Sequence, residues 1–130
     1  MDPIADMLTQ IRNAQAVGKE RVELSHSQAK ENLARFLAKK GYLSGVRVFK
    51  PRGGAFKMLA LELKYFEGEP FVQHIKRVSS PGRRFYVGKE KLPSVLAGKG
   101  LVVVSTSRGL MSAKEARKRS LGGEVVCEVW

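Results

Sequence analysis

The sequence contains little of what catalysis, disulfide bonding or membrane insertion requires. Its 130 residues include one cysteine, two histidines and two aspartates. The single Cys127 excludes an intrachain disulfide, which suits a reducing compartment such as the cytoplasm. No apolar run approaches the roughly 18 residues of a transmembrane helix, and the first residues show no secretory signal. We therefore expect a small cytoplasmic protein with no membrane partner.

The few groups that could perform catalysis fall into no recognisable arrangement. A Ser-His-Asp triad would have to unite His26 or His74 with an aspartate from the first six residues, and the spacing does not favour this. One cysteine and two isolated histidines do not make a zinc site. The Gly-Lys-Gly at 98–100 lacks the first glycine and the following hydroxyl residue of a phosphate loop. We expect that the protein is not an enzyme and binds no metal or cofactor. Cys127 is expected to be a small hydrophobic residue of the core.

Positive charge is what the chain has in excess. It has 24 Lys and Arg against 12 Asp and Glu, so the net charge is +12, and the pI is about 10.2. The segment 74–100 contains seven basic residues and one acidic residue, which is half of the excess. A segment of one sign suits a surface that faces phosphate groups, although a merely solvated surface would show the same charge. The leading hypothesis is a polyanionic partner.

Residues 1–66 predict an α/β lobe in which two helices lie on a small sheet. The first helix would start with Asp2 as N-cap and Pro3 at its first position, and would end at Gly18. Its apolar residues recur at helical spacing: Ile4, Met7, Leu8, Ile11 and Ala14.

The second helix of this lobe would begin with Ser25 and Gln28, which are spaced as a capping box, and end at Gly41. Lys30 lies outside its apolar stripe, so we expect this side chain to reach solvent or a ligand. The residues of that stripe are Ala29, Leu33, Phe36 and Leu37.

The sheet of the first lobe is predicted from alternating apolar residues. The strands are expected at 21–24, 43–50 and 55–65, with a turn at 51–54. In the last strand Phe56 would share a face with Met58 and Ala60. The Glu-Gly-Glu-Pro at 67–70 then predicts a linker between two lobes.

Residues 71–130 predict a mostly β lobe with one short helix, so the fold class is α+β. Ser112 and Glu115 are spaced as a capping box for a helix at 113–119. A turn is expected at 80–82 and a short helical turn at 92–96. The strands are expected at 73–79, 83–87, 101–104 and 124–130.

Two clusters of this lobe have side chains suited to RNA. Ser105, Thr106 and Ser107 should lie on an exposed loop and could contact bases, ribose hydroxyls or phosphates, or could simply cap local backbone groups. The Arg83–Tyr86 sequence would bury Phe85 on one face and present Arg84 and Tyr86 on the other, for backbone contact and base stacking. Alternatively, Tyr86 could cover the core and keep its hydroxyl at the rim.

Three separated motifs resemble the family of the eighth protein of the small ribosomal subunit. The C-terminal signature is matched by the residues at 104–109, 115–118 and 122–124. The bacterial N-terminal signature resembles residues 2–8 and 11–13, and the middle motif resembles 77–79, 81–84 and Tyr86. The likeness spans nearly the whole chain.

The resemblance implies a primary rRNA-binding protein that docks on the central domain of small-subunit rRNA and helps to organise the platform. It implies contacts with the fifth and twelfth small-subunit proteins, and in some members with the messenger RNA of the protein's own operon. The main target would be an irregular RNA helix. The candidate RNA-binding residues are Lys30, Arg83, Arg84, Tyr86, Ser105, Thr106, Ser107, Gly123 and Glu124.

Two residues of the C-terminal motifs raise separate questions. Glu124, an acid in a positive interface, could pair with Arg108 or Arg117, or could accept hydrogen bonds from RNA amino groups. Ser120 stands where family members usually have glycine as the helix stop, and a left-handed serine there should cost about 1 kcal/mol.

The alternative function is a stand-alone regulatory RNA- or DNA-binding protein, such as a translational repressor. A helix-turn-helix would need two helices joined by about 3–4 residues. The strand expected between the first two helices weighs against this arrangement.

Overall fold

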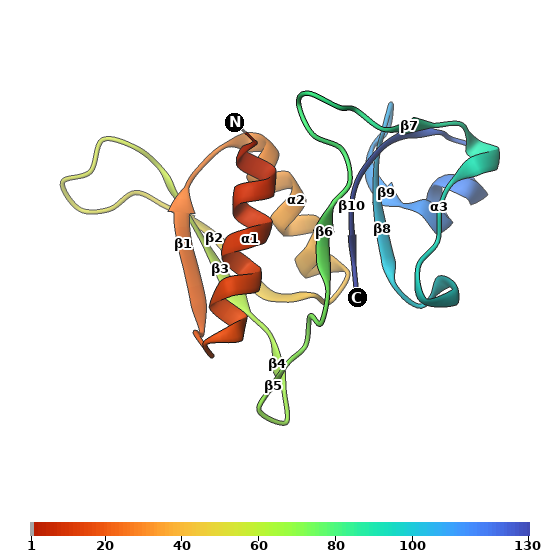
Figure 1. Ribbon diagram of the computed structural model, residues 1–130. Helices are drawn as coiled ribbons and strands as arrows, with labels where there is room; N and C mark the ends of the chain where they lie inside the picture. Colours follow the sequence, from red (N-terminus) through yellow and green to blue (C-terminus); the bar gives the residue numbers. More distant parts are fainter. Residues whose placement is uncertain (1) are drawn as a thin grey trace. The chain divides into compact units, whose positions relative to one another are not determined.

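The computed structural model describes residues 2–130, which form two compact units (Figure 1). One unit is Asp6–Val72, and the other combines residues 2–5 with Gln73–Trp130. The mixture of helices with antiparallel sheets confirms the α+β fold class. No helix within residues 2–130 is long and apolar enough to cross a membrane.

The unit Asp6–Val72 consists of two helices on a three-stranded antiparallel sheet of order β1-β3-β2. Leu59 and Leu61 of the central strand are fully buried, as are Ile11 and Leu37 of the two helices. A short β4–β5 hairpin follows, and its turn contains Glu67 and Gly68. The elements are α1 (Pro3–Ala16), β1 (Arg21–Ser25), α2 (Gln28–Lys39), β2 (Leu43–Phe49), β3 (Met58–Leu63), β4 (Tyr65–Phe66) and β5 (Glu69–Pro70).

Helix α1 starts and ends as predicted, whereas the start of α2 differs. The Asp2 carboxylate accepts a hydrogen bond from the Ala5 backbone N–H, and Gly18 follows the helix with a φ of +75°. The N-cap of α2 is Ser27, whose hydroxyl accepts from the Lys30 N–H. Ser25 was the wrong cap because it is still the last residue of β1.

The second unit is built around β10, which pairs with β6, β7 and β8 (Figure 1). Its core lies between this sheet and α3, where Val102, Val104 and Ala116 are buried. Ser112 caps α3 as predicted, since its hydroxyl accepts from the Glu115 N–H at 3.1 Å. The elements are β6 (Ile75–Arg77), β7 (Tyr86–Val87), β8 (Leu101–Thr106), β9 (Gly109–Ser112), α3 (Ala113–Lys118) and β10 (Gly123–Val129).

Two local predictions for this unit were wrong. Helical turns of the 3₁₀ type occur at Lys89–Lys91, before the position expected at 92–96, and at Leu96–Gly98, which begins at the last residue of that range. The strand β9 was missed altogether, and it converts the expected serine-rich loop into a tight hairpin.

Candidate nucleic-acid interface

The β8–β9 hairpin positions the three hydroxyl residues differently from one another. Thr106 pairs with Gly109, so Ser107 and Arg108 form the two-residue turn. The Thr106 hydroxyl accepts from the Arg108 N–H at 3.0 Å and donates to the Gly109 carbonyl at 2.9 Å. It therefore caps the turn, whereas Ser107 is exposed and its hydroxyl has no protein partner among residues 2–130.

Strand pairing brings three of the predicted residues into one row. Glu124 on β10 lies directly opposite Tyr86 on β7 and directly opposite Ser105 on β8. Residues paired in this way share a sheet face, with β-carbons about 4.5–5.5 Å apart. The Tyr86 side of the row is open to solvent, since this residue is 68% exposed. An aromatic ring, a carboxylate and a hydroxyl thus adjoin on one surface.

The carboxylate in this row is partnered by Arg84. Arg84 Nη1 donates to Glu124 Oε2 at 3.0 Å, and this hydrogen bond raises the pKa of the guanidinium. Pairing of Glu124 with Arg108 or Arg117 was therefore the wrong expectation. Arg117 instead donates to the Leu92 carbonyl at 3.0 Å, because it lies on α3, which contacts the 3₁₀ turn at Lys89–Lys91.

The basic segment before β7 is held by a buried serine. Ser79 is fully buried, and its hydroxyl accepts from the Phe85 N–H at 2.8 Å. The backbones of Ser80 and Arg83 bond to each other in both directions and close the predicted turn. Phe85 itself is 46% exposed, so its predicted burial was wrong: the strand starts only at Tyr86, and the preceding residues do not alternate between faces.

Gly122 and Gly123 permit the close approach of neighbouring strands. A β-carbon on Gly123 would overlap the Ser105 carbonyl oxygen, and one on Gly122 would overlap the Val87 carbonyl oxygen. Gly123 thus acts through the backbone that sets Glu124 beside Ser105.

Lys30 lies in the other unit, Asp6–Val72, and is 7% exposed. Its Nζ donates to the Ser25 hydroxyl at 3.1 Å. The expectation that it points away from the buried face was wrong, because this face begins at Lys30 whereas Ala29 is exposed. The aliphatic stem of a lysine can cover apolar surface while its ammonium keeps a polar partner.

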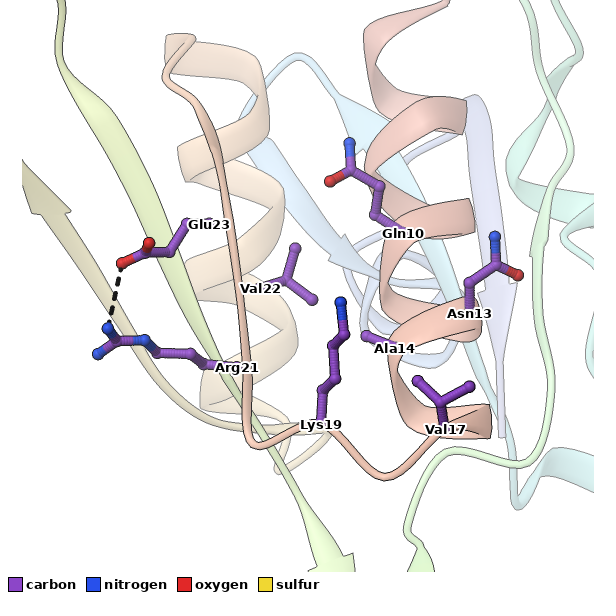
Figure 2. Close-up of a pocket in the computed structure, with 8 residues that line it drawn as sticks. All are labelled: Gln10, Asn13, Ala14, Val17, Lys19, Arg21, Val22 and Glu23. Carbon is purple, nitrogen blue, oxygen red and sulfur yellow. Dashed lines mark ion pairs between the residues drawn. The ribbon is translucent and has the colours of Figure 1, made fainter.

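The same unit contains a shallow groove of about 410 Å³ between α1 and β1 (Figure 2). Gln10 and Asn13 extend from the helix, and Lys19 lies between helix and strand. Arg21 and Glu23 form an ion pair of 3.4 Å at the edge, with both side chains about half exposed. With one carboxylate and no histidine or cysteine, this lining does not suit catalysis.

The described residues provide neither a cluster of metal ligands nor a reactive thiol. Across residues 2–130, no group of three or more His, Cys, Asp or Glu side chains could hold a metal ion. Cys127 is buried as predicted, and burial raises the pKa of its thiol to about 12. A thiol that stays protonated is a poor nucleophile.

Comparison with known proteins places these features in one family. Residues 2–130 match the family model described as ribosomal protein S8. The small ribosomal subunit protein uS8 of Saccharophagus degradans is 50% identical over 129 residues, which cover 99% of this chain and 97% of that protein. The uS8 proteins of Teredinibacter turnerae and Hydrogenovibrio crunogenus are 46% and 47% identical, and cover 99% and 98% of this chain and 97% and 96% of their own lengths.

Proposed function

Because this chain belongs to the ribosomal protein S8 family, we propose that it is a structural constituent of the small ribosomal subunit and binds the rRNA of that subunit directly. Family membership confirms the expectation that the chain is not an enzyme. The protein is located in the cytoplasmic ribosome. The specific target is an irregular helix in the central domain of the rRNA, where binding helps the platform to assemble.

The row formed by Tyr86, Glu124 and Ser105, with Ser107 exposed beside it, is the observation that supports this proposal. A regular A-form duplex hides its base edges in a deep groove, so reading a sequence requires bases that are splayed out. A flat ring suits the face of such a base, and short hydroxyl and carboxylate groups on a rigid sheet suit its edge.

Charge near this row supplies attraction rather than selectivity. Arg83 is exposed, and Arg84 is about half exposed although it donates to Glu124. Such guanidinium groups bind phosphate oxygens and position the RNA without reading its sequence. The uncharged Ser105 and Ser107 and the ring of Tyr86 would then distinguish the irregular helix from a regular one.

The proposed role in the small subunit also includes specific partners. Contacts with the fifth and twelfth small-subunit proteins belong to the proposal, as does binding to the messenger RNA of the protein's own operon. The alternative of a stand-alone regulator has less support. The two long helices are separated by β1, which is not the arrangement of a helix-turn-helix.

A Ser107→Val variant tests the proposal. We expect its affinity for a short irregular rRNA helix to fall by about 1–3 kcal/mol, because a specific polar contact is lost, while its affinity for a regular duplex of equal length stays nearly constant. Ser94→Val is the matched control, since Ser94 is an exposed serine of the same unit outside the row. Equal losses on both RNAs would refute recognition by this turn.

A further inference from the structure

The loop between β2 and β3, residues 50–57, is a second concentration of positive charge. It contains Lys50, Arg52 and Lys57 and no acidic residue. The wider segment 32–61 has seven basic residues and no acidic one, a net +7 that exceeds the +6 of segment 74–100. The acidic residues elsewhere in 1–73 reduce the net charge of that whole segment to +4, so its total charge does not reveal this concentration.

Phe56 lies in this loop and is 80% exposed. The predicted strand position beside Met58 was wrong, because β3 starts at Met58 and the preceding residues belong to the loop. Figure 1 shows the loop as an excursion away from the ends of β2 and β3. An exposed ring beside cations is the combination that binds single-stranded nucleic acid, because a base can stack on the ring while the cations pair with phosphates.

The backbone of the loop is fixed at its tip and its base. The Gly54 N–H donates to the Pro51 carbonyl at 2.9 Å, and Gly53 has the left-handed φ of +78° that glycine tolerates. At the base, the His26 N–H donates to the Lys57 carbonyl at 3.2 Å. The loop thus presents its side chains from a defined backbone, which lowers the entropic cost of binding.

The cations of the loop are available to an outside partner. Lys50, Arg52 and Lys57 are exposed, and none of them forms an ion pair within residues 2–130. At the root of the loop, Arg47 lies over the ring of Phe49, with 5.1 Å between the guanidinium carbon and the ring centroid. This contact extends the combination of aromatic and basic groups onto the sheet.

We propose that the 50–57 loop is a second RNA contact, in which Phe56 stacks on an unpaired base while Lys50, Arg52 and Lys57 neutralise phosphates on either side. This inference rests on the proposed function, since it gives a ribosomal chain an RNA-binding element in each of its two units. Stacking suits any base because every base has a flat π-face, and cations on both sides of the ring suit the phosphates that flank one nucleotide. An apolar protein groove would bury Phe56 but would leave three desolvated cations without partners.

The β4–β5 hairpin provides a matched control. Phe66 lies in a short hairpin of the same unit and is 66% exposed, but it is followed by Glu67 and Glu69 instead of basic residues. Phe66→Ala removes the same exposed ring in a setting of opposite charge. Phe56→Tyr keeps a ring that can stack.

The test measures the affinity of the full chain for a 12-nucleotide oligouridylate, which has no secondary structure, and for the irregular rRNA helix. A stacked base is worth about 1–3 kcal/mol, so Phe56→Ala should weaken oligouridylate binding about 5-fold or more. Phe56→Tyr and Phe66→Ala should stay within about 2-fold of the native protein. Arg52→Gln should lower the salt dependence by a slope of up to about 0.7 for one phosphate contact on a single strand.

The outcomes separate this inference from the proposed function. Failure of the native protein to prefer the irregular helix over a regular duplex refutes the proposed function. Equal effects of Phe56→Ala and Phe66→Ala on oligouridylate, or no oligouridylate binding by the native protein at low salt, refute the loop contact. Unchanged RNA binding by Phe56→Ala, together with poor incorporation into subunits reconstituted from rRNA and proteins, would assign the loop to a protein partner and also overturn the inference.

Discussion

Arg84 and Glu124 lie 40 positions apart in the chain and join through a 3.0 Å hydrogen bond from Arg84 Nη1 to Glu124 Oε2. The Glu124 side chain is 15% exposed and that of Arg84 is 47% exposed, so the carboxylate is the more enclosed partner. Because Glu124 also lies opposite Tyr86 and Ser105, it occupies the centre of the candidate interface. One acidic residue thus limits how freely a cation of this surface can turn toward phosphate.

Glu124→Gln should weaken discrimination between RNAs. The amide keeps the shape of the side chain and can still accept a hydrogen bond, but it removes the negative charge that holds Arg84. Arg84 can then turn toward phosphate more readily, so the affinity for a regular duplex should rise. Affinity for the irregular helix should rise less, or should fall. The difference in binding free energy between the irregular helix and the regular duplex should therefore decrease by about 1 kcal/mol. Parallel titrations of both RNAs measure this. Glu90→Gln is the control, since it removes the same charge from an exposed position of the unit; an equal effect of both variants would contradict a specific role for Glu124.

All three α-helices within residues 2–130 are followed by a left-handed residue, and the comparison of α2 with α3 supports a stability prediction. After α2 the residue is Gly41 with φ +89°, and after α3 it is Ser120 with φ +56°. In both cases the next N–H reaches back to a helix carbonyl, as in Leu121 to Ala116 at 2.9 Å. The left-handed conformation expected to be costly at Ser120 is thus present.

Ser120→Gly should therefore raise the free energy of unfolding by about 1 kcal/mol, because glycine adopts this conformation without strain. The midpoint of thermal unfolding should rise by about 4 °C. Ser94→Gly is a useful contrast, since Ser94 has no left-handed backbone and the substitution should destabilise slightly. A Ser120→Gly protein no more stable than the native one would contradict the assigned geometry.

Local patterns predicted the elements whose signals lie within a few residues of each other. The β-branched run that includes Val102 and Val104 indicated a buried strand, and the spacing of Ser112 and Glu115 indicated the cap of α3. The strand β9 is only four residues long and follows a Ser-Arg turn, which is not a typical hairpin signal. Without such a turn signal, the sequence does not indicate that these four residues pair with β8.

Candidate site residues were easier to identify than their partners. Tyr86, Ser105 and Glu124 were named from the sequence, but only strand register places them in one row. The Arg84–Glu124 pair depends on the same register, whereas the sequence pointed to Arg108 and Arg117, which lie nearer to Glu124 in the chain. Lys30 was identified as a candidate from its charge, but the sequence did not indicate that it is buried. Its ammonium group donates a hydrogen bond to the Ser25 hydroxyl.

The Cys127 thiol gives a prediction for alkaline pH. Burial raises its pKa from 9.0 to about 12, so the folded protein binds this proton more tightly than the unfolded chain does. The associated stability is complete below pH 9 and is lost as the pH rises toward 12, by up to about 1.4 kcal/mol per pH unit. Denaturant titrations between pH 8 and 11 should show that the free energy of unfolding decreases less with pH for Cys127→Ala than for the native protein.

The reactivity of the Cys127 thiol provides a second measurement. At pH 8 a chromogenic disulfide reagent should react with this thiol only after denaturation; rapid reaction of the folded protein would contradict its burial.

Gly123→Ala should disturb both the fold and the interface, because its β-carbon would overlap the Ser105 carbonyl oxygen of the neighbouring strand. Backbone atoms cannot rotate away as a flexible side chain can, so β8 and β10 must separate locally. We expect a loss of about 2 kcal/mol in the free energy of unfolding, within the range for overpacking. Gly82→Ala is the matched control, since a β-carbon there meets open space and Gly82 has no positive φ. The local separation of β8 and β10 would lie beside the Glu124–Ser105 pair. The Gly123→Ala protein should therefore also bind the irregular helix more weakly, at temperatures where it is fully folded. Normal binding by a destabilised Gly123→Ala protein would show that RNA recognition does not depend on the register of these two strands.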